Sequence, residues 1–327
     1  MHPMIASAGN NPVSLRISVT DRCQFRCLYC MPATGVDICD HRDVLSFEEI
    51  VRFVRLVKSS FDLSKVRLTG GEPLVRRNLV DLVSMLANEG VRDLSLTTNA
   101  QCLAAMAGEL KQAGSNCVNI SLDSLDERTF GALTRGGKLK STLDGIDAAL
   151  RENLSPVKLN TIVLKGPNHT DVTDMALWAM SHNCHIRFLE LMPIGCAKGI
   201  FKELFVSESE TRGRLATALH LKALPGATDQ SSRDFEATDH YGLRGTVGFI
   251  ASETHPSCQG CRRLRLTSTG QLISCLARGE GPNVRALLRG DGGRSEHRLR
   301  EVITHELAAK RARIGFDTLH LMASVGG

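Results

Sequence analysis

The regular alternation of short strand-like runs with amphipathic stretches between Leu15 and Gly195 is the feature that most restricts the fold of this chain. Such a pattern is typical of repeated βα units around a parallel sheet. The predicted strands are Leu15–Val19, Val66–Thr69, Leu94–Thr98, Val118–Leu122, Val157–Leu164 and Ile186–Met192. The predicted helices are Ser46–Ser60, Leu79–Glu89, Leu103–Gln112, Ser141–Glu152 and Met175–Ser181, and a capping box at Ser46 opens the first. Six such units predict an α/β fold in the form of an incomplete barrel.

Polar and apolar side chains alternate within several of these strands. Successive side chains of a strand point to opposite faces of the sheet, so one face of this sheet is predicted to be polar. An ordinary barrel of this class fills its centre with Val, Ile and Leu, and a polar interior costs stability unless a ligand pairs with it. We therefore expect a wide lumen that holds a polar ligand. The alternative is that these strands are edges with solvated faces. The inward polar residues are Arg16, Ser18, Arg67, Thr69, Asn119, Ser121, Asp123, Lys158 and Asn160.

The βα alternation stops after Gly195, and a smaller unit is predicted to follow. Residues Ala223–Asp239 are rich in Pro, Gly, Ser and Asp, which predicts a loop or linker. A strand at Gly242–Ile250, a hairpin at Leu264–Ser274 and a helix at Glu296–Arg313 are expected beyond it. This divides the chain into a partial barrel, residues 1–222, and a small α+β domain, residues 223–327.

Three cysteines lie close together directly after the first predicted strand. Cys23, Cys27 and Cys30 have C-x3-C-x2-C spacing, which suits three of the four irons of a [4Fe-4S] cluster. The fourth iron then has no protein ligand and can bind a small molecule. A structural zinc site normally has four ligands, and this loop offers three thiols. The remaining alternative is chance clustering among the eleven cysteines of the chain.

A glycine pair follows the second predicted strand, in the sequence Thr69-Gly70-Gly71-Glu72-Pro73. Two glycines let a backbone approach a ligand closely, so that its polar groups can bind an amino group. A simple strand-to-helix turn is the alternative for this segment alone. Because both segments follow neighbouring parallel strands, we expect them at the same end of the sheet.

A second group of cysteines lies near the C-terminus. Cys258, Cys261 and Cys275 follow a C-x2-C-x13-C pattern, and the predicted hairpin would bring the third thiol back to the first two. This favours a second [4Fe-4S] cluster that is again one ligand short. A zinc ribbon completed by His255 is the alternative.

Arginines are concentrated next to these late cysteines. In Arg262-Arg263-Leu264-Arg265, the side chains of Arg263 and Arg265 point the same way on a strand. Both guanidinium groups are therefore expected to face one anion beside the second cluster.

Composition excludes several other classes of protein. A net charge of +5 with one Trp and two Tyr does not favour a nucleic-acid-binding platform. The start of the chain lacks a signal-peptide pattern, and no run of eighteen apolar residues occurs, so we expect a soluble cytoplasmic protein with no membrane partner. The segment 131–138 departs from P-loop spacing by one residue, so side-chain cations would have to hold any nucleotide phosphates.

Together these motifs resemble the radical S-adenosylmethionine (SAM) superfamily, in which an aromatic residue precedes the last cysteine of the loop, as Tyr29 does here. The late cysteine spacing, the Arg-Leu-Arg segment inside it and the terminal Gly326-Gly327 resemble, more narrowly, the GTP 3',8-cyclase (MoaA-type) family of molybdenum-cofactor biosynthesis. The likeness covers nearly the whole chain.

The resemblance implies a role for each matching residue. Cys23, Cys27 and Cys30 would hold the SAM-cleaving cluster, and Cys258, Cys261 and Cys275 an auxiliary cluster that binds guanine. The residues implied to contact SAM are Tyr29, Gly71, Ser121 and Met192. Those implied to bind the rest of GTP are Arg16, Arg67, Thr98, Lys158, Arg263 and Arg265, and Gly326 and Gly327 would reach into the site. In three places the chain departs from the family pattern: Gln24 stands where Asn is common, Ala100 where Gly is usual, and Arg262 where Asn is usual.

The same resemblance implies the reaction. A 5'-deoxyadenosyl radical would take the 3'-hydrogen from the ribose of GTP, and the sugar radical would attack C8 of guanine. The small C-terminal domain would cap the barrel mouth. Cyclic pyranopterin monophosphate synthase would take the product, flavodoxin or ferredoxin would supply electrons, and the protein would be a monomer or homodimer. The rival readings are a radical SAM enzyme that modifies a peptide and a metal-binding protein without turnover.

Overall fold

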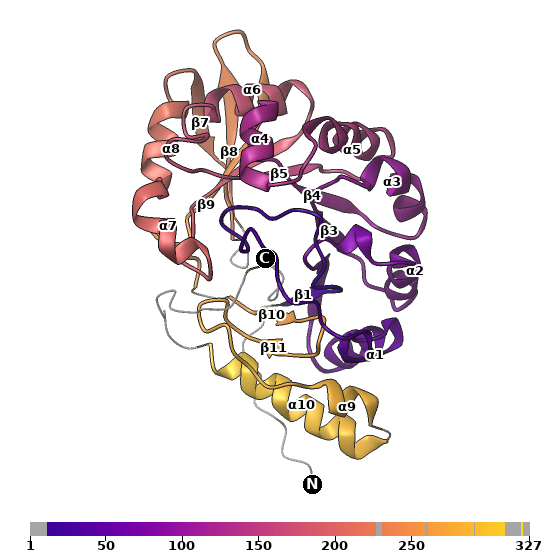
Figure 1. Ribbon diagram of the computed structural model, residues 1–327. Coiled ribbons are helices and arrows are strands. Elements are labelled where there is room, and N and C mark those ends of the chain that lie inside the picture. The colour runs from indigo at the N-terminus through magenta and orange to yellow at the C-terminus, as the bar shows by residue number, and fades with distance from the viewer. Residues whose placement is uncertain (1–11, 227–230, 259–260, 291, 311–321, 323–327) are drawn as a thin grey trace.

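The computed structural model describes residues 12–226, 231–258, 261–290, 292–310 and 322. One sheet of eleven strands runs through these residues, in the order β11-β10-β1-β2-β3-β4-β5-β6-β9-β8-β7. The sheet curves into an arc with helices on its outer side (Figure 1). Within the described ranges, no helix combines the length and apolar character needed to cross a membrane.

Six parallel strands in chain order form the centre of the arc. They are β1 (Val13–Ser18), β2 (Leu63–Thr69), β3 (Leu94–Thr98), β4 (Cys117–Ser121), β5 (Lys158–Ile162) and β6 (His185–Leu189). All six predicted strands are thus present, with small differences at their ends. The α/β fold with a partial barrel is confirmed, and the strands are not solvated edges, because each has a neighbour on both sides.

The helices that cover this sheet include all those predicted. They are α1 (Phe47–Ser60), α2 (Leu79–Asn88), α3 (Leu103–Gln112), α4 (Glu127–Thr134), α5 (Leu139–Arg151) and α6 (Val172–Ser181). The capping box is confirmed, because the Ser46 hydroxyl accepts from the Glu49 amide at 3.2 Å and the Glu49 carboxylate accepts from the Ser46 amide at 2.7 Å. Two single 3-10 turns, η1 (His41–Asp43) and η2 (Pro73–Val75), lie between these elements.

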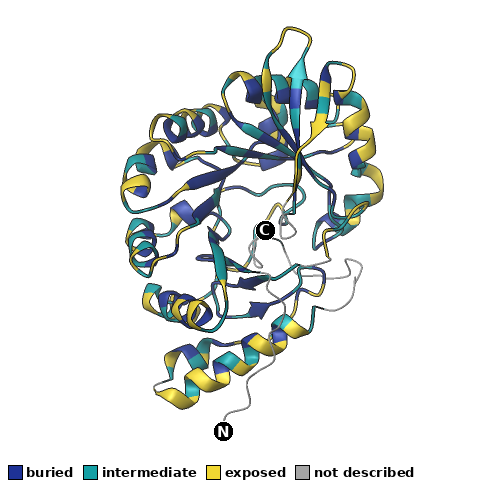
Figure 2. Ribbon diagram, turned by 180° about the vertical axis from the view of Figure 1, so that it is seen from behind, coloured by how far each residue is buried: buried dark blue, intermediate teal, exposed yellow. Residues whose placement is uncertain are grey.

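The hydrophobic core lies between the sheet and its helices. The apolar side chains of the alternating strands are buried here, among them Leu15, Ile17, Val66, Leu68 and Ile120. Figure 2 shows buried residues along the strands and exposed residues on the outer surfaces of the helices. The outward side of the sheet is therefore apolar and packed, which leaves the polar side for the lumen, as the alternation predicted.

The C-terminal part of the chain extends this sheet at both of its ends. Strand β9 (Arg244–Ile250) pairs in parallel with β6, and β10 (Arg263–Leu266) pairs in parallel with β1. The predicted hairpin is confirmed, since β10 runs antiparallel to β11 (Leu272–Ile273). The remaining helices are α7 (Ala197–Leu204), α8 (Glu208–Leu215), α9 (Arg285–Arg289) and α10 (Gly293–Ala308).

The loop or linker prediction for Ala223–Asp239 was wrong over most of its second half, whereas 224–226 and 231–232 lie outside any helix or strand. Most of its second half is β8 (Arg233–Asp239), which pairs antiparallel with β9 and with β7 (Leu219–Ala223). The hairpin lies at the end of the sheet, where one face is solvated, so its polar residues are compatible with a strand. The domain boundary after residue 222 stays a prediction, and it would fall inside β7.

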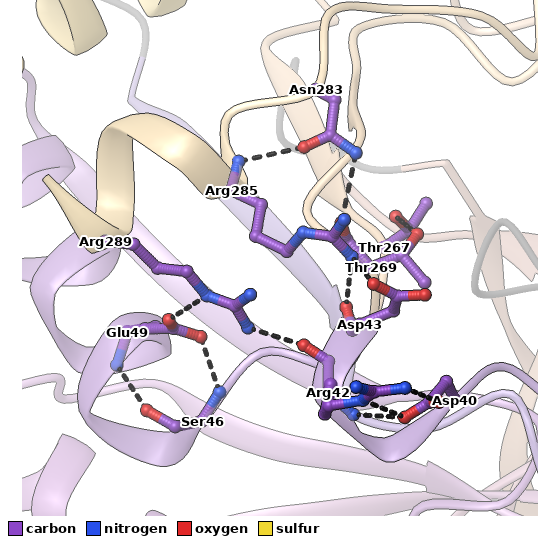
Figure 3. Close-up of polar contacts among 10 residues, drawn as sticks. All are labelled: Asp40, Arg42, Asp43, Ser46, Glu49, Thr267, Thr269, Asn283, Arg285 and Arg289. Atoms are coloured by element: carbon purple, nitrogen blue, oxygen red, sulfur yellow. Dashed lines mark hydrogen bonds and ion pairs between the residues drawn. The ribbon is translucent and has the colours of Figure 1, made fainter.

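Helix α9 is held against the segment around η1 by two arginines (Figure 3). Arg285 donates to the carbonyl of Asp43 at 2.8 Å and forms an ion pair with its carboxylate at 2.9 Å. Arg289 forms an ion pair with Glu49 at 2.7 Å and donates to the carbonyl of Arg42 at 3.0 Å. These contacts join the C-terminal elements to the segment between the first cysteine loop and α1.

Candidate active site

Both groups of cysteines line one cavity inside the arc, with a volume of about 380 Å³. Cys23, Cys27 and Cys30 come from the loop after β1, whereas Cys258, Cys261 and Cys275 come from the segments on either side of β10 and β11. Segments more than two hundred residues apart in the chain thus share a single chamber.

The glycine pair after β2 packs against the beginning of the first cysteine loop. The Gly71 amide donates to the Thr20 carbonyl at 2.8 Å, and the Glu72 amide donates to the Arg22 carbonyl at 2.8 Å. A Cβ atom on Gly70 would lie 2.6 Å from the Thr20 carbonyl oxygen, and one on Gly71 would overlap the Arg22 carbonyl. Glycine is therefore needed here because two backbones approach each other closely.

Burial and mutual repulsion act on the thiols of the first loop. Burial raises the pKa of Cys23 to about 11. Burial also raises the pKa of Cys27, and the neighbouring Cys30, Asp123 and Cys23 add to this effect. Thiolates here need a nearby positive charge, which iron supplies when a cluster binds. Three thiols from one loop facing one cavity fit the cluster that the C-x3-C-x2-C spacing predicts.

Glu72 is fully buried beside this loop. Its carboxylate accepts hydrogen bonds from the Thr98 hydroxyl at 2.6 Å, the Asn99 amide at 2.7 Å and the Leu74 amide at 3.0 Å. Burial raises the pKa of Glu72 to about 7, although these hydrogen bonds favour the ionised form. A cation that enters the cavity next to Glu72 would favour ionisation further.

Tyr29 and Asp123 form a second buried polar pair on the cavity wall. The Tyr29 hydroxyl donates to the Asp123 carboxylate at 2.6 Å, and the Ile162 amide donates to the same carboxylate at 2.9 Å. Burial raises the pKa of Asp123 to about 6. The ring of Tyr29 is thereby fixed next to Cys27 and Cys30, where it lines the cavity with Ser121 and Met192.

Cations surround the second group of cysteines. Burial alone would raise the pKa of Cys261, but the charges of Lys310 and Arg263 outweigh it and lower this pKa. The Lys310 ammonium lies 3.5 Å from the Cys261 sulfur. His255, the ligand that a zinc ribbon would require, lies 3.4 Å from the Glu208 carboxylate and does not line this cavity within the described residues.

Six arginines line the chamber. Arg278 is exposed, and the charges of the other five repel one another: Arg16, Arg67, Arg187, Arg263 and Arg265. Burial lowers the pKa of Arg265 to about 9, with Arg263 as the next cause, and lowers that of Arg67 to about 10, with Arg187 as the next. Burial also lowers the pKa of Arg16, and three of the other arginines contribute.

These guanidinium groups have few partners of their own. In the described part of the chain, Arg67, Arg187, Arg263 and Arg265 form no ion pair with a carboxylate. One terminal nitrogen of Arg265 is buried without a hydrogen-bond partner among the described atoms. Clustered, buried cations of this kind form a site for an anion with several negative charges.

The structure brings most of the predicted site residues together. The four predicted SAM contacts line the cavity, as do Arg16, Arg67, Thr98, Arg263 and Arg265 from the predicted GTP set. Lys158 is not among the described lining residues, and burial and Arg187 lower its pKa. Gly326 and Gly327 lie outside the described residues.

Sequence reasoning missed Arg187 and Lys310, both of which line the cavity. Arg187 lies between the buried Ile186 and Phe188 on β6, so the alternation used for the other strands was the signal that would have found it. Ala100, one of the departures from the family pattern, adopts a left-handed backbone with φ of 62°. This conformation favours glycine, which accounts for the residue usual at that position.

A partial parallel barrel with a cysteine loop after its first strand and a glycine pair after its second is characteristic of radical SAM enzymes. Residues 17–179 match the family model described as Radical SAM superfamily, and residues 184–316 match the one described as Molybdenum Cofactor Synthesis C. The chain thus combines a radical SAM region with a second conserved region.

Curated relatives identify the family more narrowly. The chain is 41% identical over 319 residues to a protein of Moorella thermoacetica named GTP 3',8-cyclase, covering 96% of this chain and 97% of that one. It is 39% identical over 317 residues to the protein of that name from Thermodesulfovibrio yellowstonii, again covering 96% and 97%. The chain belongs to the GTP 3',8-cyclase family.

Solved structures agree with the radical SAM fold. The crystal structure of Streptococcus suis SuiB matches with a TM-score of 0.61 and 13% identity, covering 86% of this chain and 64% of that chain. The chain therefore spans just under two thirds of that protein's length, and the likeness concerns the fold alone.

Proposed function

We propose that this radical SAM enzyme catalyses the reaction for which its relatives are named, the 3',8-cyclisation of GTP. The observation that carries the proposal is a single cavity lined by two cysteine groups and six arginines. The cysteines suit iron-sulfur clusters, and the clustered arginines suit a ligand with several negative charges. The cavity therefore fits a nucleoside triphosphate better than an uncharged substrate.

The first loop is proposed to hold one [4Fe-4S] cluster through Cys23, Cys27 and Cys30. When bound there, the cluster and SAM would supply the radical chemistry needed to remove the ribose 3'-hydrogen. The chain's own contribution is orientation. The buried carboxylate of Glu72 and the backbone at Gly71 would bind the amino group of SAM, and Tyr29, Ser121 and Met192 would position its remaining groups.

The opposite wall is proposed to bind GTP. Cys258, Cys261 and Cys275 would hold a second [4Fe-4S] cluster next to the base, and Arg16, Arg67, Thr98, Lys158, Arg263 and Arg265 would bind the rest of the nucleotide. Arg187 joins this set because it lines the same chamber. The role of Gly326 and Gly327 in catalysis stays a prediction. Holding both reactants in one chamber lowers the entropic cost of bringing C3' to the radical.

One anaerobic assay tests the proposal. The reconstituted protein is incubated with SAM, GTP and dithionite, and the nucleotide products and 5'-deoxyadenosine are separated and quantified. The proposal requires that GTP is consumed and that deoxyadenosine forms with it. Deoxyadenosine without loss of GTP would favour the peptide-modifying alternative.

Metal analysis of the anaerobically purified protein tests the alternative that the protein binds a metal but catalyses no reaction. Roughly eight irons per chain are expected for two four-iron clusters. About one zinc and no iron would support a zinc-binding protein instead.

The proposed place of the reaction follows from its chemistry. The cyclised nucleotide would pass to cyclic pyranopterin monophosphate synthase, and flavodoxin or ferredoxin would supply electrons in the cytoplasm, where thiols stay reduced. A monomer or homodimer is the expected state, and size-exclusion chromatography with light scattering measures it.

A further inference from the structure

The first cysteine loop has two differently built sides. Cys23, Phe25, Cys27 and Tyr29 line the cavity, whereas the residues between them do not. Of these intervening residues, Gln24 is exposed and Arg26 is half-buried, and Arg22, directly before Cys23, is exposed as well. The side of the loop that faces away from the substrate chamber is therefore partly exposed and carries cations.

The C-terminal end of α4 packs against this outer side. The Arg26 amide donates to the Thr134 carbonyl at 2.8 Å, and the Leu28 amide donates to the Leu133 carbonyl at 2.9 Å. Arg135 follows directly, so its Cα lies on the order of 10 Å from that of Cys27, given the spacing of consecutive Cα atoms. Arg135 and Lys138 are both exposed at this position.

Hydrogen bonds hold these cations in place. The Arg135 amide donates to the Gly131 carbonyl at 2.9 Å, and the Lys138 amide donates to the Gln101 side chain at 3.1 Å. The Arg26 guanidinium donates to the carbonyls of Cys23 at 2.5 Å and Phe25 at 3.0 Å. Four positive charges thus lie on or beside the backbone that carries the thiols.

Negative charge is sparse at this surface. The exposed acids nearest in the chain are Asp37, beyond the cysteine loop, Asp144, which forms an ion pair with Lys140 at 2.9 Å, and Glu127, at the opposite end of α4. A helix of eight residues places that end on the order of 12 Å from Arg135. The surface formed by Arg22, Arg135 and Lys138, with Arg26 behind it, is therefore net positive, and we call it the basic collar.

We propose that the basic collar is the docking surface for an acidic, low-potential one-electron carrier protein. The proposal rests on the proposed function, because only a redox cluster at these thiols needs electrons from outside. One electron passes from the reduced cofactor of the carrier to the cluster, so the carrier is oxidised by one electron and the cluster reduced by one, with no group transferred. Transient redox complexes bury little surface and depend on opposite charges for fast encounter.

The test compares protein-driven with chemical reduction of the cluster-loaded enzyme. The variant Arg135→Glu with Lys138→Glu reverses the charge of two residues that neither line the cavity nor contact the thiols. Flavodoxin serves as the acidic carrier, and no GTP is added. Samples are frozen rapidly at successive times, and the paramagnetic signal of the reduced cluster measures the extent of reduction. The matched control, Lys222→Glu with Arg244→Glu, makes the same charge change on β7 and β9 at the far end of the sheet.

The flavodoxin-driven rate is expected to fall about tenfold or more in the collar variant and to stay unchanged in the control. Reduction by dithionite should match the unaltered protein in both, and the neutral variant Arg135→Gln with Lys138→Gln should fall in between. Raising the ionic strength should slow flavodoxin-driven reduction of the unaltered protein. A salt-independent rate, or equal flavodoxin rates in collar variant and control, would overturn the proposal. Because this measurement needs no GTP, it succeeds or fails separately from the cyclase assay.

Discussion

Replacing Arg265 with methionine is expected to make the nucleotide-free protein more stable and its binding of GTP weaker. The Arg265 side chain is buried, with the residue 6% exposed, and lies among other guanidinium groups of the cavity wall. Burial, followed by the charge of Arg263, lowers the pKa of Arg265 to about 9. The folded state therefore disfavours the charged form, and methionine fills similar space without a charge.

The magnitude follows from the pKa. A depression of three to four pKa units at ~1.36 kcal/mol each corresponds to a cost on the order of 4 kcal/mol. Because the pKa of this base is lowered in the folded state, the charged side chain destabilises the folded protein by the full amount at pH 7. This destabilisation diminishes only as the pH rises above about 9. Part of it is recovered when the side chain becomes apolar, so unfolding should require ~1–4 kcal/mol more free energy. Loss of one charge-assisted hydrogen bond to phosphate, ~1.5–3 kcal/mol, should weaken GTP binding roughly 10- to 100-fold.

Urea unfolding and equilibrium dialysis with GTP measure the two effects on the same anaerobic preparation. Arg151→Met, an exposed site at the end of α5, serves as the control, and its stability should change by less than ~0.5 kcal/mol. The reasoning is refuted if Arg265→Met lowers stability by more than the control does, or if its GTP affinity is unchanged.

Three further predictions address the SAM half of the cavity. Cys23→Ser should abolish deoxyadenosine formation and lower the iron content of the reconstituted protein by roughly half, whereas a fully active variant would contradict the ligand assignment. Gly71→Ala should lower the free energy of unfolding in urea by ~1–3 kcal/mol, because the added Cβ overlaps the Arg22 carbonyl. Gly131→Ala, with open space around it, should not lower it, and equal stability of the two variants would count against the close approach. Since burial raises the pKa of Glu72 to about 7, SAM should bind more tightly in dialysis at about pH 8 than at about pH 6, and a pH-independent affinity would separate Glu72 from the SAM site.

The sequence predicted the central strands and the inward polar residues because both depend on local alternation. Arg16 and Arg67 point into the lumen for the same reason that Ile17 and Leu68 point out of it, since neighbouring residues of one strand face opposite sides. The cysteine and glycine motifs were equally local, and their meeting at one end of the sheet follows from parallel strands.

The features that were missed depend on contacts distant in sequence. Strand β8 has a polar composition that fits a loop, and its pairing with β9 makes it a strand. Lys158 is the first residue of β5, whereas the cysteine loop follows the last residue of β1. Alternation predicts which face of the sheet a side chain lies on, but not how far along the lumen it lies. Lys310 meets Cys261 across forty-nine residues, a distance at which no pattern in the sequence operates.

The pairing of β10 with β1 and of β9 with β6 has a consequence for synthesis of the protein. When the first two hundred residues have left the ribosome, both borders of the six-stranded sheet still present unpaired backbone groups. Such borders readily pair with other chains, so the nascent arc is exposed to aggregation until its last strands arrive. The segment that completes the substrate chamber is thus also the one that seals the fold, and truncation before β9 is expected to remove solubility together with activity.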